Sequence, residues 1–407
     1  MITFVIQTLD WLKYGQFHYF WLFFVYVWVV WTIKAVISRF YKEVTDEYQT
    51  TVSVIVPVFR EDYSIFDRVL ASIASNHPDE IIVAPNGSRD EVIETIAQRY
   101  ASKVISLPNP GKRQALAVSI REATGNVVVI VDSDTVWQMD TLWEMIKPFA
   151  DPAVGGVTTN QRISDPDRNF VRRFCDWMED LRFTWSTPAQ SVFGTVGCLS
   201  GRTIAFRRHL LLEVLDEFLN EYFLGVKLEI GDDRSLTNFA LKRGWRTVYQ
   251  RSARVYTDCP NIWSKFVKQQ TRWARSSQRE TIRQIRWLVK KPFLAFCFLT
   301  DIVTPFFLAG VFFNIAWRFW SGTTYIPIIE GTMLANIPAQ LAIATTGILL
   351  SIGVRQIPHF VKKPQDLWLL PVFVVALTII LIPIRIWGFM TMTGNDWITR
   401  TEKEKEK

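Results

Sequence analysis

The distribution of apolar residues limits the folds that this chain can adopt. A long polar region separates one apolar segment near the start from three near the end of the 407-residue chain. A helix needs about 20 apolar residues to cross a bilayer. The sequence therefore predicts membrane helices at both ends, in segments 17–37, 293–320, 334–354 and 367–390.

Basic residues predict how these segments are oriented. The end of the first segment carries three cations, Lys34, Arg39 and Lys42, whereas Lys13 alone precedes the segment. Because Lys and Arg are enriched on the cytosolic side, residue 40 onward should be cytosolic, and the cations at 355–363 should return the chain there. The same flanking cations explain the net charge of +7. No nucleic-acid-binding motif accompanies them, so we expect no nucleic-acid partner.

The polar region alternates strand and helix patterns. Short β-branched runs at 52–58, 80–84, 103–107 and 127–131 are separated by helical patterns. This alternation predicts an α/β fold with a mostly parallel sheet and helices on both faces. Ligands of such sheets bind beyond the carboxyl ends of the strands. After this region, residues 155–159 are predicted to form an edge strand.

We expect five regions along the chain. Apolar spacing with arginines on the other face predicts a membrane-surface helix at about 169–185 within the second region. The regions are an interfacial segment and membrane helix (1–40), a cytosolic α/β domain (41–260), an amphipathic interface helix (261–292), a membrane hairpin followed by a proline-broken segment (293–390), and a cytosolic loop with a charged tail (391–407).

Two acidic motifs are candidate catalytic sites. Asp132-Ser133-Asp134 follows a valine-rich strand, where carboxylates suit Mg²⁺ or Mn²⁺ bound to a nucleotide diphosphate. Asp232-Asp233 suits a general base that takes a proton from a sugar hydroxyl, because neighbouring carboxylates raise one pKa. The alternatives are a solvated turn for the first motif and a helix N-cap for the second.

Cations and an aromatic residue complete the pattern. Lys112 and Arg113 begin a predicted helix, where an anion could bind or the pair could simply be solvated. Gln269, Arg272 and Trp273 fall within about one helical turn, so Arg could contact pyrophosphate and Trp could stack on a sugar. The alternative is a helix whose Trp faces the membrane. Asp301, inside an apolar segment, is either part of a polysaccharide path or interfacial.

Together these motifs resemble the processive family 2 glycosyltransferases, which include hyaluronan, chitin and cellulose synthases and nodulation chitooligosaccharide synthases. The order of DxD, Gly-Asp-Asp-Arg and Gln-x-x-Arg-Trp before membrane segments carries the resemblance, which covers nearly the whole chain. It implies a glycosyltransferase-A fold and a UDP-sugar-dependent hexosyltransferase. The enzyme would be a multi-pass protein of a bacterial plasma membrane, with its catalytic domain in the cytosol.

The resemblance also implies roles for individual residues. Asp233 would be the base with Asp232 beside it, and Asp134 would hold Mg²⁺ or Mn²⁺. The acceptor polysaccharide would lie against Cys198, Ser200, Gly201 and Trp273. The UDP-sugar would be bound by Pro57, Glu61, Asn86, Lys112, Arg113, Asp132, Arg234, Gln269, Gln270, Arg272 and a C-terminal loop with Trp397, Thr399 and Arg400.

Two positions depart from the family pattern. Asn86 stands where relatives often have an Asp that binds uracil, and Ile398 replaces a Gly of the C-terminal loop. Topology raises a further problem, since a third complete crossing would place Trp397 outside the cell. We therefore predict that Pro383 and Arg385 break 367–390 into a re-entrant or interfacial hairpin.

The resemblance is strongest to capsular cellobiuronan synthases, which implies UDP-glucose and UDP-glucuronate as substrates. Cations at Arg162, Arg202 and Arg207 could meet a glucuronate carboxylate. Hyaluronan synthase, which uses UDP-N-acetylglucosamine and UDP-glucuronate, is the alternative, although Arg202 replaces a proline usual there. Other classes are a non-processive lipid-linked sugar transferase and an inactive membrane partner. The oligomeric state is not predicted.

Overall fold

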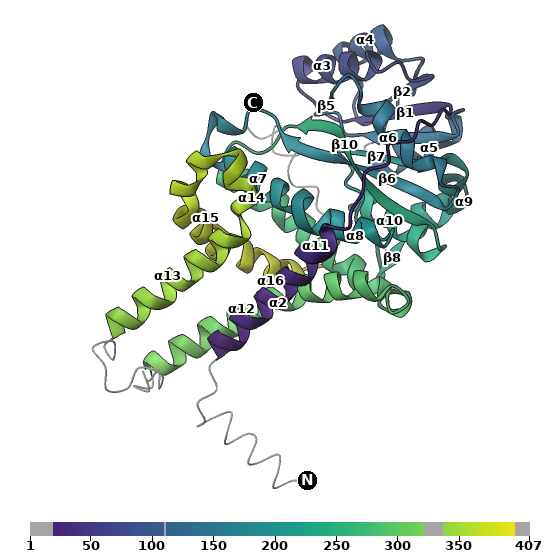
Figure 1. Ribbon diagram of the computed structural model, residues 1–407. Coiled ribbons are helices and arrows are strands. Elements are labelled where there is room, and N and C mark those ends of the chain that lie inside the picture. The colour runs from purple at the N-terminus through teal and green to yellow at the C-terminus, as the bar shows by residue number, and fades with distance from the viewer. Residues whose placement is uncertain (1–18, 110, 321–336, 395–407) are drawn as a thin grey trace. The chain divides into compact units, whose positions relative to one another are not determined.

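The computed structural model describes residues 19–109, 111–320 and 337–394 (Figure 1). The predicted interfacial segment before residue 13 and the loop with Trp397, Thr399 and Arg400 lie outside these residues. The chain divides into two compact units. The first contains Met1–Lys34 and Leu299–Ile386, and the second contains Ala35–Phe298 and Trp387–Lys407.

An eight-stranded sheet forms the centre of the second unit, in the order β3-β2-β1-β4-β7-β6-β10-β5. β1 pairs in parallel with β2 and β4, and β6 with β10, whereas β7 and β5 pair antiparallel to their neighbours. The strands are β1 (Val52–Val58), β2 (Glu80–Pro85), β3 (Lys103–Val104), β4 (Val127–Val131), β5 (Thr135–Trp137), β6 (Val154–Ile163), β7 (Thr203–Arg207) and β10 (Arg246–Thr257).

Helices cover both faces of the sheet, as the alternating pattern predicts. One core joins β1 and β4 to apolar side chains of α3 (Tyr63–Ala74), α4 (Glu91–Tyr100) and α6 (Thr141–Ile146). The opposite core joins the sheet to α5 (Lys112–Glu122), α9 (Arg208–Leu219) and α10 (Asp232–Lys242). The predicted fold class is confirmed, and the strand ends that precede Asn86 and Asp132 lie in one parallel group.

The prediction of an edge strand at 155–159 was wrong, because β6 lies inside the sheet between β7 and β10. Its parallel partner β10 begins at Arg246, so no local pattern could reveal the pairing. Gly155 and Gly156 permit this packing. A Cβ at Gly155 would lie 2.7 Å from Trp245 Cβ, and one at Gly156 would lie 2.6 Å from Leu199 Cδ1.

The segment predicted to be a membrane-surface helix forms α7 (Phe170–Leu181), followed by a π-helical turn (Arg182–Ser186) and α8 (Thr187–Val192). Asn169 caps α7 by accepting a hydrogen bond from the Arg172 amide. Charged as well as apolar side chains of α7 are buried within the unit, namely Arg172, Asp176, Glu179 and Asp180. The charged residues are therefore used inside the unit rather than in a solvated face.

α11 (Trp263–Leu288) also buries polar side chains, including Gln270, Gln278 and Arg279. The end of the described chain packs on α11: a Cβ on Gly388 would lie 2.6 Å from Ala274 Cβ. Shorter elements complete this unit, namely the helical turns Lys147–Ala150 and Pro166–Arg168 and a hairpin of β8 (Tyr222–Phe223) and β9 (Val226–Lys227).

The first unit is helical. It contains most of α2 (Tyr19–Ser38) and of α12 (Pro292–Trp320), α13 (Ile337–Arg355), α14 (Ile357–Lys362), a 3-10 helix (Pro364–Leu369), α15 (Leu370–Ala376), a π-helical segment (Leu377–Leu381) and the start of α16 (Ile382–Met390). Within the described residues, Pro292–Asn314 and Pro364–Met390 are long and apolar enough to cross a membrane.

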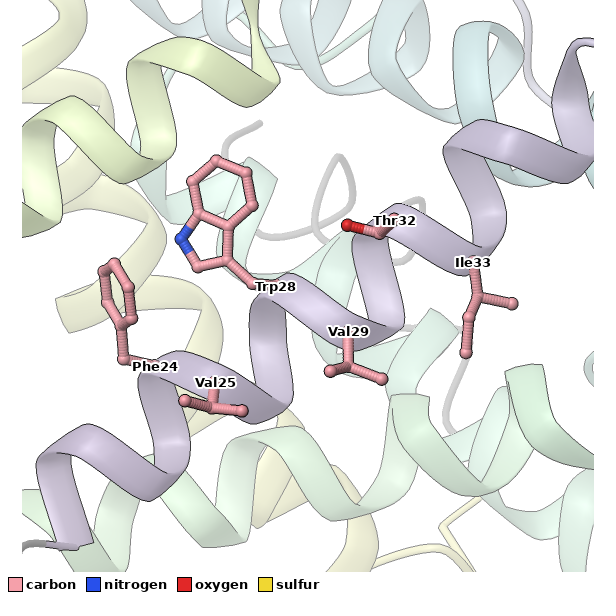
Figure 2. Close-up of a pocket in the computed structure, with 6 residues that line it drawn as sticks. All are labelled: Phe24, Val25, Trp28, Val29, Thr32 and Ile33. Atoms are coloured by element: carbon pink, nitrogen blue, oxygen red, sulfur yellow. The ribbon is translucent and has the colours of Figure 1, made fainter.

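Asp301 has an ionic partner in this unit, since its carboxylate lies 3.5 Å from Lys34 Nζ. The pair joins α12 to α2, as does the hydrogen bond between Tyr26 and Thr304. A shallow apolar hollow runs along α2 between Phe24 and Ile33 (Figure 2). Its lining comes from one helix and contains no titratable group, so it does not resemble an active site.

The expected break at Pro383 is absent, because helical structure continues from Leu370 through Met390. Proline cannot donate the backbone hydrogen bond of an α-helix and clashes with the preceding turn. Here the π-helical segment Leu377–Leu381 lies directly before α16. Its wider turn accommodates proline without dividing the helix into a hairpin.

Candidate active site

The second acidic motif begins α10. Gly231 precedes it with φ +85°, a conformation that favours glycine, and a side chain there would also collide with Ser276. Asp232 and Asp233 then occupy the first turn, where the helix dipole stabilises negative charge. The N-cap position is therefore Gly231, and the N-cap alternative for the two aspartates is wrong, since they are the first two residues of the helix.

Lys112 brings the two acidic motifs together. It is the first residue of α5, and its Nζ lies 2.8 Å from Asp132 Oδ1 and 2.9 Å from Asp232 Oδ2. Burial opposes the charge of Lys112, but the two carboxylates prevail and raise its pKa. Lys112 therefore stays charged and holds the end of β4 against the start of α10.

Asp233 differs from Asp232 because its hydrogen bonds come from uncharged groups. Its Oδ2 accepts a hydrogen bond from the Gly201 amide at 3.0 Å and lies 3.9 Å from Cys198 Sγ, while Oδ1 accepts from the Arg234 amide at 2.7 Å. Burial and the charge of Asp232 raise the pKa of Asp233. For Asp232, burial acts the same way, but Lys112 outweighs it and lowers the pKa. The pair thus contains one stabilised carboxylate and one carboxylate that readily accepts a proton.

Asp134 lies at the same end of the sheet. Its Oδ1 is 3.3 Å from Thr257 Oγ1 at the end of β10, and its carbonyl accepts from the Asp258 amide. Within the described ranges, no group of three or more His, Cys, Asp or Glu side chains could hold a metal alone. Carboxylate and hydroxyl oxygens still fit Mg²⁺ or Mn²⁺, which often take one or two protein carboxylates and complete their shell with phosphate and water.

Glu61 and Gly201 also lie beside the two acidic motifs. Glu61 accepts a 2.7 Å hydrogen bond from Ser133, the middle residue of the DxD motif. Gly201 leaves the space above Asp233 unfilled by a side chain: a Cβ there would lie 3.4 Å from Asp233 Cβ and 3.6 Å from Lys112 Nζ. The neighbouring Ser200 carbonyl accepts from Gln161 at 3.3 Å.

Trp273 lies on α11 with 38% of its surface exposed. The Arg202 guanidinium lies 5.5 Å from the centre of its ring and 2.8 Å from Glu179. Since Arg202 follows Gly201, Trp273 is near the loop that contacts Asp233. Gln269 and Arg272 are half-buried on the same helix, and Gln270 is buried.

Three side chains that were predicted to bind the nucleotide are buried within the protein. Arg113 is buried, pairs with Glu221 at 2.7 Å and stacks on the Phe218 ring. Asn86 is buried and joins two loops, donating to the Val58 carbonyl at 3.0 Å and accepting from the Gly111 amide at 3.2 Å. Pro57 is buried within β1. Arg113 and Asn86 thus have polar partners within the protein, and Pro57 is part of the sheet.

Other predicted ligand contacts are also engaged within the protein. Arg234 donates to Ser277 Oγ at 2.7 Å and lies 4.5 Å from the Phe298 ring centre, so it links α10 to α11 and α12. The three cations considered for glucuronate have internal partners. Arg162 pairs with Asp176 and Asp180, Arg202 pairs with Glu179, and Arg207 donates to backbone carbonyls.

Sequence reasoning missed several acidic partners. Glu179, Glu221 and Glu280 are buried and pair with arginines that are distant in sequence or one helical turn away. No motif marks them, and a buried glutamate cannot be distinguished from a solvated one by spacing alone. Arg279, which is buried on α11, is not part of a motif either.

The fold and these carboxylates define a glycosyltransferase with a glycosyltransferase-A fold. The chain belongs to glycosyltransferase family 2: residues 49–276, more than half of its length, match the family described as "Glycosyltransferase like family 2". It is similar to a hyaluronan synthase from Streptococcus pyogenes, with 28% identity over 366 residues, covering 86% of this chain and 83% of the relative.

Two further comparisons agree with this assignment. An N-acetylglucosaminyltransferase from Rhizobium meliloti (strain 1021) is 30% identical over 360 residues, covering 86% of this chain and 81% of the relative. The solved structure of a mannosyltransferase from Pyrobaculum calidifontis, in complex with GDP-Man and Mn²⁺, has a TM-score of 0.59 and 20% identity, covering 95% of this chain and 97% of that one. The structural likeness supports the fold.

Proposed function

We propose that the chain is a membrane-embedded, processive, inverting polysaccharide synthase that uses UDP-sugars. The observation that carries this proposal is the unequal acidic pair. Lys112 neutralises Asp232, while burial and the neighbouring carboxylate raise the pKa of Asp233. Such a carboxylate suits a general base near neutral pH. The similarity to a hyaluronan synthase supports the polymerising activity.

In the proposed reaction, Asp233 takes the proton from an acceptor hydroxyl. The hydroxyl oxygen forms a bond to the anomeric carbon of the donor sugar from the face opposite UDP. The bond between that carbon and the diphosphate oxygen breaks, and UDP leaves with the electron pair. This single displacement inverts the anomeric centre, and the proton remains on Asp233 until solvent removes it.

The other side chains position the reactants. Gly201 leaves room for the acceptor above Asp233, and the exposed ring of Trp273 offers a stacking surface for a sugar. Asp134 would hold Mg²⁺ or Mn²⁺, which supplies positive charge to the leaving diphosphate. The mannosyltransferase with a similar fold was solved with Mn²⁺, which supports a divalent ion.

The sugars proposed are glucose and glucuronate, added in alternation to a β-linked capsule-type polymer. This assignment rests on the resemblance to the streptococcal type 3 capsular polysaccharide (cellobiuronan) synthase. The arginines considered for glucuronate do not support this assignment, because Arg162, Arg202 and Arg207 bind partners within the protein. Hyaluronan synthesis from UDP-N-acetylglucosamine and UDP-glucuronate is the alternative, and the similarity to a hyaluronan synthase favours it. A lipid-linked sugar transferase has no need for the Gln-x-x-Arg-Trp motif.

We also propose that segment 364–390 does not cross the membrane completely. The residues that follow it belong to the catalytic unit, where Arg275 Nε donates to Thr391 Oγ1 at 2.9 Å and Arg279 donates to the Met392 carbonyl at 3.3 Å. If residue 355 is cytosolic, both ends of the segment are on that side. A cysteine placed at position 400 should react with an impermeant label only from the cytosolic side, and labelling from outside would contradict this topology.

One assay separates these possibilities. Purified protein is incubated with Mn²⁺ or Mg²⁺ and pairs of radiolabelled UDP-sugars, and product size is measured on a gel. A long polymer that requires UDP-glucose and UDP-glucuronate supports the proposed sugars, whereas a polymer that requires UDP-N-acetylglucosamine identifies a hyaluronan-type enzyme. A single sugar transferred to a lipid would contradict processive synthesis.

A further inference from the structure

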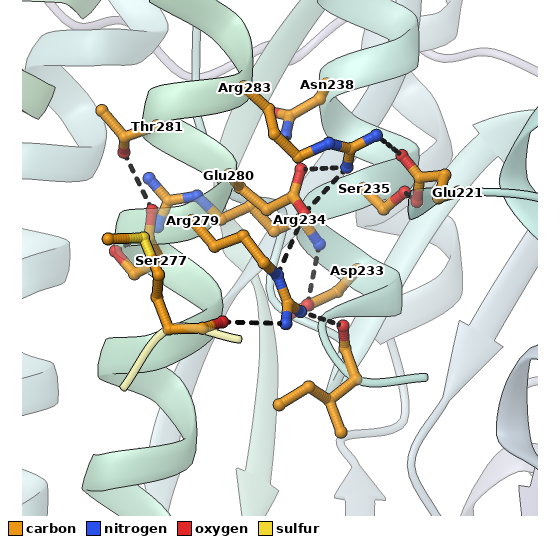
Figure 3. A network of polar contacts seen from close by, with 12 residues as sticks. Glu221, Asp233, Arg234, Ser235, Asn238, Ser277, Arg279, Glu280, Thr281 and Arg283 are labelled. Carbon is orange, nitrogen blue, oxygen red and sulfur yellow. Dashed lines mark hydrogen bonds and ion pairs between the residues drawn. The ribbon is translucent and has the colours of Figure 1, made fainter. Parts of the chain in front are cut away.

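Arg279 is fully buried in the middle of α11. Burying a guanidinium is costly unless hydrogen bonds replace its lost water contacts. The side chain meets this need partly through backbone carbonyls, donating from Nη2 to Ile230 at 2.9 Å and from Nη1 to Met392 at 3.3 Å (Figure 3). Its Nε also lies 3.8 Å from Glu280.

The first of these carbonyls belongs to the turn that carries the proposed base. Ile230 directly precedes Gly231, the left-handed residue after which Asp232 and Asp233 begin α10. Ser276, one turn earlier on α11, lies where a side chain on Gly231 would project. The same face of α11 therefore fixes both the carbonyl before Gly231 and the space around it.

The second carbonyl belongs to the last described segment of the chain. Arg275 lies four residues before Arg279, on the same face of α11. Its Nε donates a hydrogen bond to Thr391 Oγ1 at 2.9 Å, while Arg279 donates to the Met392 carbonyl. One guanidinium thus joins two backbone segments that are more than 150 residues apart in the sequence, as the separation between Ile230 and Met392 shows.

We propose that Arg279 is a positioning residue for the transferase reaction, because it clamps the turn before Asp232 and Asp233 to the 391–394 segment. Its planar fork can donate to two acceptors at fixed angles, which the single ammonium of lysine cannot reproduce. Both of these hydrogen bonds go to backbone carbonyls, so Arg279 acts on the two carboxylates through the backbone. The inference rests on the proposed function, in which Asp233 is the base.

The test compares Arg279→Lys with Arg283→Lys, which lies four residues later on α11. Arg283 belongs to the same polar network and pairs with Glu221 at 2.7 Å and Glu280 at 2.9 Å, both away from Ile230 and Met392. Both variants keep the positive charge and should lower the melting temperature. In Arg279→Lys, kcat should fall about 10- to 100-fold with KM for the UDP-sugar within about threefold, because small displacements of a catalytic group are costly. Arg283→Lys should keep kcat within about threefold.

Two readouts distinguish positioning from general destabilisation. The acid limb of the kcat profile should shift in Arg279→Lys alone, since the pKa of Asp233 depends on its burial and on Asp232. Amide hydrogen exchange should accelerate at 230–235 and 391–394 in that variant alone, a measurement that needs no activity. Unchanged kcat and unchanged exchange in a folded Arg279→Lys, with active wild-type protein, would overturn the inference. A wild-type protein inactive with every nucleotide sugar would instead contradict the proposed function.

Discussion

Two polar clusters meet α10, and they use similar side chains differently. The acidic cluster consists of Asp132, Lys112, Asp232 and Asp233 at the start of the helix. The Arg–Glu cluster consists of Arg113, Glu221, Arg283 and Glu280 farther along. Figure 3 shows Glu221, Arg283 and Glu280 of this cluster. In the acidic cluster three carboxylates share one ammonium group, whereas two carboxylates and two guanidinium groups balance in the Arg–Glu cluster.

This difference shows which cluster is suited to chemistry. Neighbouring residues on α5 supply a cation to each cluster, because consecutive helix positions point about 100° apart. Lys112 leaves the acidic cluster with excess negative charge, which favours a bound cation or a transferred proton. Arg113 completes ion pairs on Glu221 and stacks on Phe218, which favours a fixed structure. Substitutions in the two clusters should therefore affect different measurements.

The largest effect on activity is expected for Asp233→Asn. Loss of the proposed base should reduce the polymerisation rate about 10²- to 10⁴-fold while UDP binding remains, as measured by calorimetry and radiolabel incorporation. Polymerisation at the wild-type rate would exclude Asp233 from this role.

The same variant should be more stable than wild type at pH 7.5. Because the folded state raises the pKa of Asp233, it favours the protonated carboxyl, and stability is lost as the pH rises through that raised value. Asparagine removes this loss, so the melting temperature should rise at neutral pH and change little at pH 4. A lower melting temperature at pH 7.5 would contradict the raised pKa.

Lys112→Met should have the next largest effect and lower both the stability of the fold and the activity. It leaves Asp132 and Asp232 facing each other without the ammonium group that now lies within 2.9 Å of each. We expect unfolding free energy to fall by about 2–4 kcal/mol and kcat to fall about 10- to 100-fold. Thermal unfolding and incorporation assays on the same preparation measure both, and unchanged kcat would separate Lys112 from the reaction.

Arg113→Met is the matched control, since it changes the adjacent cation. It breaks a buried ion pair and should reduce unfolding free energy by about 3–5 kcal/mol. The folded fraction should retain kcat within about threefold, because the ion pair and hydrogen bonds of Arg113 go to Glu221 and the Phe218 carbonyl, and its charge only adds to that of Lys112 in lowering the pKa of Asp232. A loss of kcat as large as that of Lys112→Met would remove the distinction between the clusters.

The smallest effect is expected at Cys198. Burial and the charge of Asp233 raise the pKa of this thiol to about 11. At pH 8, its alkylation by iodoacetamide should therefore be about 100-fold slower than that of a free cysteine, because the thiolate is the reactive form. Alkylation should be faster in Asp233→Asn, where the opposing charge is absent. Cys198→Ala should retain kcat within about threefold.

Much of the fold follows from local sequence pattern. The predicted strands at 52–58 and 127–131 match β1 and β4 to the residue, because buried parallel strands are continuous apolar runs. The interior position of β6 depends on β10, which lies far along the chain and carries no signal of its partner. The helix through Pro383 depends on a π-helical segment that composition does not reveal.

The candidate site also combines features that the local sequence predicts with features that only the folded chain reveals. The acidic motifs and Lys112 are found from residue type and from their position at strand and helix ends. Neither feature shows that Lys112 and Arg113 point to different clusters, because the direction of each side chain depends on the packing of α5 against α9 and the sheet. Asn86 is a similar case, since its amide is used between loops that only the folded chain brings together.

Gly201 has a consequence for how such an enzyme can be lost in evolution. A methyl group at this position would make ordinary contacts at 3.4 Å or more, so an alanine would fit without disturbing the fold. That methyl group would nevertheless occupy the space above Asp233. A single nucleotide change converts a glycine codon to an alanine codon. Under the proposed function, one such change would therefore leave a folded protein that no longer accepts a sugar chain.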